Sequence, residues 1–543
     1  MSNKFAKTMF LLIVILISGF TAIFPVGAVK TVKPEIRAIW VDAFHDGAKN
    51  PAQIKKLIKN CVKANFNTLI VQVRRRGEAY YNKSLEPRAE DRKLPANFDA
   101  LQYLIDKAHA KHLEVHAWLN TLIAWNNKKK PPKDANHLWN RHGWGVAGKD
   151  NWLSHYRKYN AATKSWSKKP TPSYFLDPGH PEALDYTVKI YLNIVKNYNV
   201  DGIHLDYARY DGLGWGYNPV NVERYNRCYG TTGLPLPKDP QWMQWRREQV
   251  TNLVRKIYLQ AIALKPQIKV SCAMITWGDS PKTTSDWKNS DAYTEVFQDW
   301  HGWLQEGIID LALPMNYFSD WKPARRLWYN KWIEWEKDHQ YGRQIAIGVG
   351  GFLQYFEDSL AQIRRASQPS KSQNHVAGVA LFAYGWNNIY SNEDYRKPAY
   401  AKTLPRQPHV YKTATNGWLF PLLSKRGYYR EPARGKKIHT KPVFPKPAPI
   451  PAMPWKSRPT KGYLQGTVVT SAGDGCDHAP VTIEATNLKK IVVKRQVFTD
   501  GSGWYGCAEL PPGIYRVGLD GKDHPRMVKI RPGVVSKVNL TLK

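Results

Sequence analysis

Eight short apolar runs, separated by segments of helical periodicity, constrain the fold of this chain more than any other feature between Glu35 and about Tyr400. The runs are rich in β-branched residues and almost continuously apolar, which is typical of strands buried on both faces of a parallel sheet. The segments between them space apolar residues three and four apart, as amphipathic helices do. The runs read IRAIWVDAF (from Ile36), FNTLIVQVR (Phe66), LEVHAWLN (Leu113), VDGIHLDY (Val200), IKVSCAMIT (Ile268), IIDLALPMNY (Ile308), QIAIGVGGF (Gln344) and VAGVALFAYG (Val376).

Eight strand–helix units over this length predict an α/β fold of the (β/α)8 TIM-barrel type, which we place at residues 35–402. A doubly wound open sheet is the alternative. It is disfavoured because no GxGxxG motif and no phosphate-binding P-loop follows the first run.

The beginning of the sequence predicts export. Residues 1–28 contain two lysines, an apolar stretch and small residues up to Ala28, which is the pattern of a cleaved signal peptide. A retained membrane anchor is the alternative, because the apolar stretch nearly reaches spanning length. We therefore expect the mature protein in the periplasm, the cell envelope or the extracellular space.

The C-terminal part of the sequence predicts a second, smaller domain. Residues 403–461 are rich in Pro and Lys and predict an extended, solvated linker. Residues 462–543 alternate short β runs with turns and predict a small all-β sandwich. Five cysteines are too few for a disulfide scaffold, although Cys476 and Cys507 could pair in an oxidising compartment.

The charge of the chain limits its partners without fixing them. Lys and Arg number 80 against 44 Asp and Glu, a formal net charge of +36. Such a surplus serves either solubility or attraction to a polyanion, such as an anionic cell-wall polymer or a membrane surface. Nucleic acid is not predicted as a partner, because the basic residues are spread along the chain and no recognition motif occurs. The sequence predicts no metal or cofactor, and it leaves the oligomeric state open.

The loops after the runs should carry the chemistry, because catalytic groups of a TIM barrel lie at the C-terminal ends of its strands. Asp206 ends the fourth run and precedes a loop rich in Tyr, Trp and Gly. Glycosidic bonds are usually cut by two carboxyl groups, of which one donates a proton and the other attacks or activates water. We predict Asp206 as the nucleophile or base, kept ionised by Arg209. An Asp that only caps the next turn is the alternative.

Two carboxyl groups compete for the role of proton donor. Asp279 follows the fifth run, where Trp277 would supply an apolar wall that raises a carboxyl pKa. Glu78 follows the second run within RRRGEAYY, where the arginines would keep it ionised. Asp279 is favoured by a narrow margin. For both residues, an ordinary solvated or salt-bridged loop carboxylate is the alternative.

Further residues at the ends of the runs are predicted to bind substrate. His116, Trp118 and Asn120 alternate along the third run and therefore share one face of the strand, although a core histidine is an equal alternative for His116. Asn316 and Tyr317 end the sixth run, where the Tyr hydroxyl would orient the nucleophile.

An arginine and several aromatic side chains complete the predicted site. Arg74 would clamp a carboxylate or acetamido oxygen of the substrate, and Trp386 follows the eighth run in an aromatic loop. The 22 Trp and 30 Tyr residues offer faces for stacking on pyranose rings, though many must be core. The long excursion from Asn126 to Pro172 is predicted to cover the substrate.

Taken together, these segments resemble the bacterial glycosyl-hydrolase-like family ten over about Glu35 to Trp386. The resemblance implies an exported barrel protein. Some members of the family act on the glycan strands of peptidoglycan. It also implies that an active-site cleft is lined by Asp206, Arg74, Glu78, His116 and Asn120. The segments that carry the resemblance are EIRAIWVDAF, FNTLIVQVRRRGEAYY, LEVHAWLN, FLDPGHPEALDY, VDGIHLDYARY, DWHGWLQEGIIDLALPMNY and GVALFAYGW.

The chain departs from related patterns at the fourth run. Many relatives carry a second acid directly after the run's last Asp, and this chain has Tyr207 there. A chitinase-type pattern would need acids where the chain has His204 and Ala208, so that mechanism is disfavoured. The C-terminal region resembles carboxypeptidase-regulatory or collagen-binding-B modules through GTV, APVTIEAT and TDGSGWYGCAELPPGIYRV.

The sequence therefore predicts an exported glycoside hydrolase that cleaves peptidoglycan-type or other polysaccharide strands with two carboxylates. A carbohydrate-binding envelope protein without catalysis, built on the same barrel, is the alternative.

Overall fold

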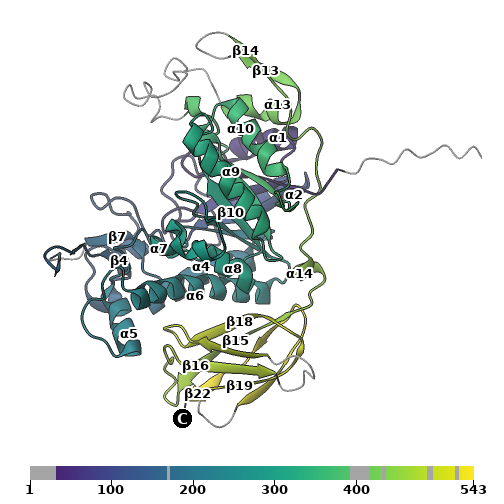
Figure 1. Ribbon diagram of the computed structural model, residues 1–543. Helices are drawn as coiled ribbons and strands as arrows, with labels where there is room; N and C mark the ends of the chain where they lie inside the picture. Colours follow the sequence, from purple (N-terminus) through teal and green to yellow (C-terminus); the bar gives the residue numbers. More distant parts are fainter. Residues whose placement is uncertain are drawn as a thin grey trace, which may run out of the picture.

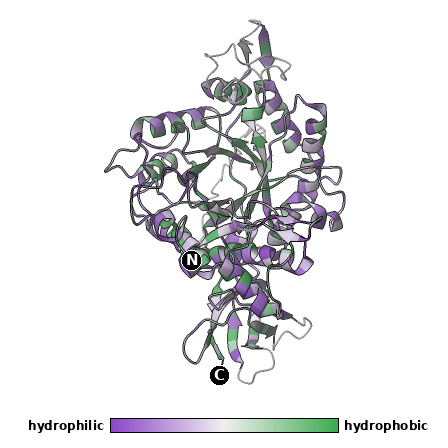
Figure 2. Cartoon of the chain, turned by 90° about the vertical axis from the view of Figure 1, so that its left-hand side faces the viewer, coloured by the Kyte–Doolittle hydropathy of each residue, from purple (hydrophilic) through white to green (hydrophobic). Residues whose placement is uncertain are grey.

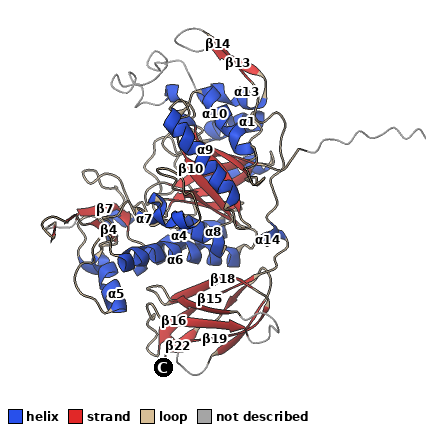
Figure 3. Cartoon of the chain, in the orientation of Figure 1, coloured by secondary structure: helices blue, strands red, loops and turns tan. Residues whose placement is uncertain are grey.

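A computed structural model confirms the predicted barrel. It describes residues 32–167, 171–391, 416–430, 436–485, 493–519 and 525–542. Eight parallel strands close into a ring in the order β1-β12-β11-β10-β9-β8-β3-β2, and helices surround them (Figure 3). The barrel strands are β1 (Ile36–Val41), β2 (Thr68–Arg74), β3 (Glu114–Asn120), β8 (Gly202–Asp206), β9 (Lys269–Met274), β10 (Leu311–Asn316), β11 (Gln344–Gly350) and β12 (Gly378–Phe382).

The strands are buried almost throughout, which explains why their sequences lack polar alternation. All six residues of β1 and all seven of β2 are buried. Figure 2 shows the hydrophobic colouring gathered on the central strands, with hydrophilic residues on the surrounding helices and loops. Close packing inside the ring also requires small residues. A Cβ on Gly202 would lie 2.7 Å from the His116 ring, so this position of β8 accepts only glycine.

The helices begin and end where local signals place them. In α1, Pro51 follows the N-cap Asn50, whose side chain accepts a hydrogen bond from Gln53 N. The helices of the barrel region are α1 (Pro51–Lys63), α2 (Ala100–His109), α3 (Leu138–His142), α4 (Pro181–Asn197), α5 (Pro219–Tyr229), α6 (Pro240–Leu264), α7 (Asp291–Thr294), α8 (Trp300–Glu306), α9 (Pro323–Asp338) and α10 (Phe356–Ser367).

The excursion between β3 and α4 forms a small subdomain of its own. It contains α3 and the strands β4 (Leu153–Tyr156), β5 (Tyr159–Asn160), β6 (Ser165–Trp166) and β7 (Thr171–Leu176), and it projects from one side of the barrel (Figure 1).

The segment predicted as a solvated linker is packed against the barrel instead. Its described part forms α13 (Leu419–Ser424), a hairpin of β13 (Gly427–Arg430) and β14 (Lys437–Thr440), and α14 (Pro454–Ser457). Phe420 and Phe444 are buried, and both rings contact Phe66. Composition alone missed this packing because the apolar side chains are few and lie among Pro and Lys.

The end of this segment closes the N-terminal mouth of the barrel. Met453 is buried among residues of the barrel floor, and Trp455 packs beside it. Asp310, fully buried, accepts hydrogen bonds from Trp455 Nε1 at 2.7 Å, Tyr258 OH at 3.2 Å and Val270 N at 2.8 Å. The ammonium of Lys456 lies 2.9 Å from the same carboxylate. The segment is therefore part of the barrel's structure.

The C-terminal region consists of two four-stranded sheets around a separate apolar core that includes Leu464, Ile483, Tyr505 and Val517. Cys476 and Cys507 are both free thiols, so the pairing that the sequence left open is not formed. The strands are β15 (Gly462–Thr470), β16 (Pro480–Ala485), β17 (Lys494–Phe498), β18 (Trp504–Leu510), β19 (Gly513–Leu519), β20 (Arg526–Ile530), β21 (Val535–Lys537) and β22 (Leu540–Leu542).

The predicted signal peptide lies outside the described residues. Within the described part of the chain, no helix combines the length and apolar character needed to cross a membrane.

Candidate active site

A cleft of about 620 Å³ lies at the C-terminal ends of the barrel strands, as the barrel rule predicts. Side chains from many of the strands and their loops line it, so the closed ring brings together residues far apart in sequence. The lining residues are Asp42, Phe44, His45, Gln72, Trp118, Asn120, Ile123, Asp206, Tyr207, Arg209, Ile275, Trp277, Met315, Tyr317, Phe352, Phe382, Trp386 and Ser391.

Asp206 lies at the end of β8, within this cleft and 8% exposed. Its Oδ2 accepts a hydrogen bond from Trp118 Nε1 at 3.1 Å, and its Oδ1 accepts one from Tyr207 N at 2.8 Å. Tyr207 has a φ of 54°, in the left-handed region that is costly for a bulky residue. Backbone strain of this kind is commonly kept at functional sites.

The protonation of Asp206 differs from the sequence prediction. Burial raises the pKa of its carboxyl to about 6, and this effect outweighs the nearby Arg209 and the two hydrogen bonds, which lower it. The guanidinium of Arg209 lies over two aromatic rings. Its Cζ is 4.7 Å from the ring centroid of Tyr207 and 5.5 Å from that of Trp277. Asp206 therefore exchanges a proton near neutral pH.

The raised pKa predicts a stability effect of Asp206→Asn. Below pH 4 the carboxyl is protonated in both folded and unfolded chains. Between pH 4 and 6 only the unfolded chain ionises, so the wild type loses up to about 3 kcal/mol of stability as pH rises. Asn lacks this loss. We expect the variant's advantage in unfolding free energy, measured by denaturant titration, to grow between pH 4 and 6 and then level off. A constant difference would contradict the raised pKa.

A second carboxylate, Asp42, lines the same cleft directly after β1. Its Oδ1 accepts hydrogen bonds from Phe44 N at 2.8 Å, His45 N at 2.9 Å and His45 Nδ1 at 2.9 Å. These bonds outweigh burial and lower the pKa of Asp42. In the ring, β2 and β3 separate β1 from β8, so Asp42 and Asp206 approach the cleft from different sides.

The sequence analysis missed Asp42, although it lies in the first quoted run. The same rule that selected Asp206, an acid where a barrel strand ends, would have selected it too. The result is a pair of carboxyl groups whose surroundings shift their pKa values in opposite directions.

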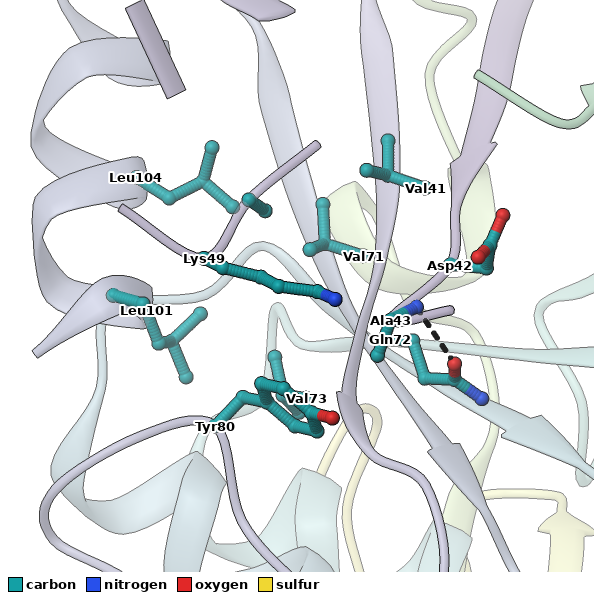
Figure 4. A pocket seen from close by; sticks show the side chains of 12 residues that line it. Val41, Asp42, Ala43, Lys49, Val71, Gln72, Val73, Tyr80, Leu101 and Leu104 are labelled. Atoms are coloured by element: carbon teal, nitrogen blue, oxygen red, sulfur yellow. Dashed lines mark hydrogen bonds between the residues drawn. The ribbon is translucent and has the colours of Figure 1, made fainter. Parts of the chain in front are cut away.

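Amide side chains join the strand ends on the Asp42 side of the cleft. Gln72 accepts a hydrogen bond from Ala43 N at 2.9 Å and donates one to Asn120 Oδ1 at 3.0 Å. Asn120 in turn donates to Arg75 O at 2.9 Å. Figure 4 shows Asp42 and Gln72 on their neighbouring strands, with the bond to Ala43 dashed. The cavity drawn there, about 10 Å³, is too small for a sugar.

Tyr317 follows β10 and is the predicted binding residue whose hydroxyl is best placed to bond a ligand. It lines the cleft, and its buried hydroxyl has no hydrogen-bond partner among the described residues. Burial, followed by the charge of Asp206, raises the pKa of Tyr317 well above its usual value. A neutral hydroxyl without a protein partner, near the reactive carboxyl, is available to a ligand.

Aromatic rings form much of the cleft wall. Trp277 is 46% exposed and Phe44 is 59% exposed. Trp386 packs against Phe352 with ring centroids 4.6 Å apart. The structure therefore brings Trp118, Asn120, Arg209, Trp277, Tyr317 and Trp386 together with Asp206 in one cleft, as the sequence predicted.

Neither predicted proton donor lines the cleft. The Asp279 side chain is 44% exposed and pairs with Lys331 Nζ at 2.6 Å, so it is a surface salt bridge. Glu78 is buried beside Arg76 at 3.0 Å. Arg76 and Arg75 lower the pKa of Glu78 as predicted, but burial outweighs them and the net pKa is raised.

Arg74, His116 and Asn316 are structural rather than ligand-facing. Arg74 holds Glu86 with two bonds of 2.8 Å, and its remaining contacts are backbone carbonyls of the loop after β3. His116 lies deep in the barrel, 3.4 Å from Ser271 Oγ. Asn316 points behind its strand and donates to Glu336 Oε2 on α9 at 2.8 Å.

The long excursion does not cover the cleft as predicted. None of the described cleft-lining residues comes from Asn126–Pro172. Trp139 and Trp152 of this segment are buried in the core, and Trp166 packs against Tyr217. Most of its tryptophans therefore stabilise the subdomain.

Comparison with known proteins identifies the family of this chain. Residues 35–354 match the model of the family described as glycosyl hydrolase-like 10. The chain belongs to this family. It is a glycoside hydrolase by membership, and the likeness extends to the glycosyl hydrolase YngK of Bacillus subtilis, 24% identical over 86% of this chain and 82% of that protein.

A second relative and a solved structure match smaller shares of this glycosyl hydrolase-like 10 chain. The glycosyl hydrolase DigH of Escherichia coli K12 is 25% identical over 58% of this chain and 66% of its own length. The PgaB (BpsB) glycoside hydrolase domain of Bordetella bronchiseptica covers 66% of this chain and 97% of that domain, with 14% identity and a TM-score of 0.47.

Proposed function

We propose that this protein is an exported hydrolase that cleaves glycosidic bonds within cell-wall glycan strands of the peptidoglycan type. The observation that carries the proposal is the cleft itself, in which two carboxyl groups with oppositely shifted pKa values lie among exposed aromatic rings. Aromatic walls suit the apolar faces of pyranose rings, and paired carboxyl groups suit glycosidic cleavage.

The two pKa shifts support a division of roles between the carboxyl groups. Asp206, whose neutral form is favoured by burial, protonates the glycosidic oxygen of the leaving group. Asp42, held ionised by its hydrogen bonds, acts on the other side of the anomeric carbon, either directly or through water. The Tyr317 hydroxyl donates to a sugar oxygen beside this centre. This assignment replaces the sequence prediction of Asp206 as the nucleophile.

The test is incubation of the purified protein with isolated glycan strands free of stem peptides. New reducing ends, with product masses that fit cleavage between sugars, are the expected result. Binding of the strands without new reducing ends, over a panel of polysaccharides, would favour a carbohydrate-binding protein and contradict hydrolysis.

The acid role of Asp206 predicts the pH dependence of kcat/KM. The protonated form is the active one, so kcat/KM should be constant below pH 6 and fall tenfold per unit above it. Asp42 should stay ionised until the pH drops below the usual range of an Asp, because its pKa is lowered. A profile that instead falls below pH 6 would make Asp206 the base or nucleophile.

Tyr317→Phe should separate activity from stability. Because no residue in the described part of the chain bonds the hydroxyl, its removal should leave the unfolding free energy unchanged or slightly higher. The loss of a donor to the substrate should lower kcat/KM by about ten- to a hundredfold, equivalent to a hydrogen bond at a reacting centre. Equal kcat/KM of the Tyr317→Phe variant and the wild type would contradict a hydrogen bond from Tyr317 to the substrate.

A further inference from the structure

A second groove, of about 300 Å³, lies between α6 and the β-sandwich and is separate from the active-site cleft. Figure 1 shows α6 running along the edge of the sandwich, so one wall of the groove belongs to the barrel and the other to the sandwich. The lining includes Gln244, Arg247 and Asn252 from α6, and His478 and Phe498 from the sandwich.

Phe498 forms an aromatic plate on the sandwich side of the groove. It ends the edge strand β17 and is 43% exposed, although it is a large apolar side chain. One face of the ring stacks on His478, with centroids 4.5 Å apart and planes 13° apart. His478 is itself supported by Trp245 and Tyr229, at 5.7 and 5.8 Å. The plate is therefore held in place from behind and open to a ligand in front.

The barrel side of the groove is polar. Arg247 is 8% exposed, and its hydrogen bonds go to neutral groups, Gln244 Oε1 at 3.0 and 3.2 Å and Tyr293 O at 3.4 Å. The nearby acid Asp299 accepts from Trp287 and Gly302. Glu248, Asp299 and Arg255 also line the groove, and Glu248 Oε1 accepts a hydrogen bond from Gln244 at 2.9 Å. Charged and amide groups beside an exposed aromatic ring are the combination of polar and apolar groups that fixes a small ligand in a pocket.

The two walls are held rigidly together. Arg224 on α5 makes two bonds of 2.8 Å to Asp477 of the sandwich, and Lys256 on α6 bonds Asp500 at 2.8 Å. Lys256 is 5% exposed and Asp500 is 2% exposed, so this pair is shielded from solvent. Ion pairs therefore join the two walls of the groove.

We propose that this groove is a second saccharide-binding site, in which a sugar ring of a polymeric glycan stacks on Phe498 while its hydroxyl or acyl oxygens meet Arg247 and the amides of α6. The inference rests on the proposed function only for the identity of the polymer. A strand that occupies both the groove and the cleft gains affinity, because the second contact is intramolecular. A short oligosaccharide that fills the cleft alone gains nothing.

The test compares Phe498→Ala with Met527→Ala in the full chain carrying Asp206→Asn, so that binding is measured without cleavage. Met527 lies on β20 of the same sandwich, is 57% exposed and does not line the groove. The probes are isolated glycan strands and chitotetraose. We expect Phe498→Ala to weaken strand binding about three- to tenfold and to leave chitotetraose binding unchanged. Met527→Ala should change neither, and Phe498→Trp should retain strand binding.

Equal strand affinity of the Phe498→Ala and Met527→Ala proteins would overturn the groove proposal, as would a chain that binds no strands. A parallel loss of chitotetraose binding would also overturn it, because that indicates a structural defect. If the protein with native Asp206 cleaves nothing but strand binding still depends on Phe498, the proposed function fails and the groove proposal stands.

Discussion

Asp206→Asn is expected to lower kcat/KM for glycan strands by about 10² to 10⁴, the usual contribution of a positioned general acid. Asn fills the same space, and its oxygen can still accept the hydrogen bond from Trp118 Nε1 that Asp206 accepts at 3.1 Å. The fold and the binding of strands should therefore be kept. The measurement is the rate of reducing-end release.

Asp279→Asn is the matched control, because it removes a carboxylate of equal size after the neighbouring strand β9. Its side chain is 44% exposed, pairs with Lys331 and accepts a hydrogen bond from Ser280 N at 2.9 Å, so the rate should stay within a factor of two. Unchanged hydrolysis by Asp206→Asn, or a loss confined to Asp279→Asn, would contradict the account of the cleft.

Asp310→Ala is expected to destabilise the barrel by about 3–5 kcal/mol, because it leaves the buried ammonium of Lys456 without its partner. The substitution also removes the acceptor for Trp455 Nε1 and Val270 N. These bonds hold the segment that closes the N-terminal mouth of the barrel. Chemical denaturation monitored by tryptophan fluorescence would show the loss as a lower midpoint.

The double variant Asp310→Asn with Lys456→Met separates the unpaired charge from the lost packing. Asn can still accept from the backbone, and Met keeps the apolar stem of Lys456 without its charge. We expect the double variant to recover more than half of the lost stability. If Asp310→Ala unfolds at the wild-type midpoint, the segment that carries Lys456 is not part of the barrel's structure.

The barrel could be predicted because buried parallel strands leave a direct signal. Each run that became a barrel strand is almost continuously apolar, which indicates a parallel sheet covered on both faces. The lack of a GxGxxG motif or P-loop then favoured the barrel over a doubly wound sheet. The packing of residues 416–457 left no comparable signal. Phe444 and Met453 are single apolar residues among prolines, and only the completed barrel offers surfaces that bury them.

The candidate site was predictable where strand ends decide the position of a side chain. Asp206, Trp118 and Tyr317 reach the cleft because each lies at the C-terminal end of a strand with the inward alternation. Charged residues were predicted less well. The sequence does not show that Glu86 would take the guanidinium of Arg74, or that Lys331 would take the carboxylate of Asp279.

The pKa of Asp206 illustrates the same limit. Arg209 is three residues away in sequence, which suggested an ionised carboxylate. Burial is a property of the folded cleft, and here it is the larger effect. The raised pKa of Asp206, about 6, therefore became evident only with the structure.

The most direct test of the central claim is a crystal structure of the Asp206→Asn protein with an uncleaved glycan oligosaccharide. We predict that a glycosidic oxygen lies within about 3 Å of the residue 206 side chain, with Asp42 on the other side of the anomeric carbon. A saccharide that occupies the cleft with every glycosidic oxygen beyond hydrogen-bond reach of residue 206 would contradict it.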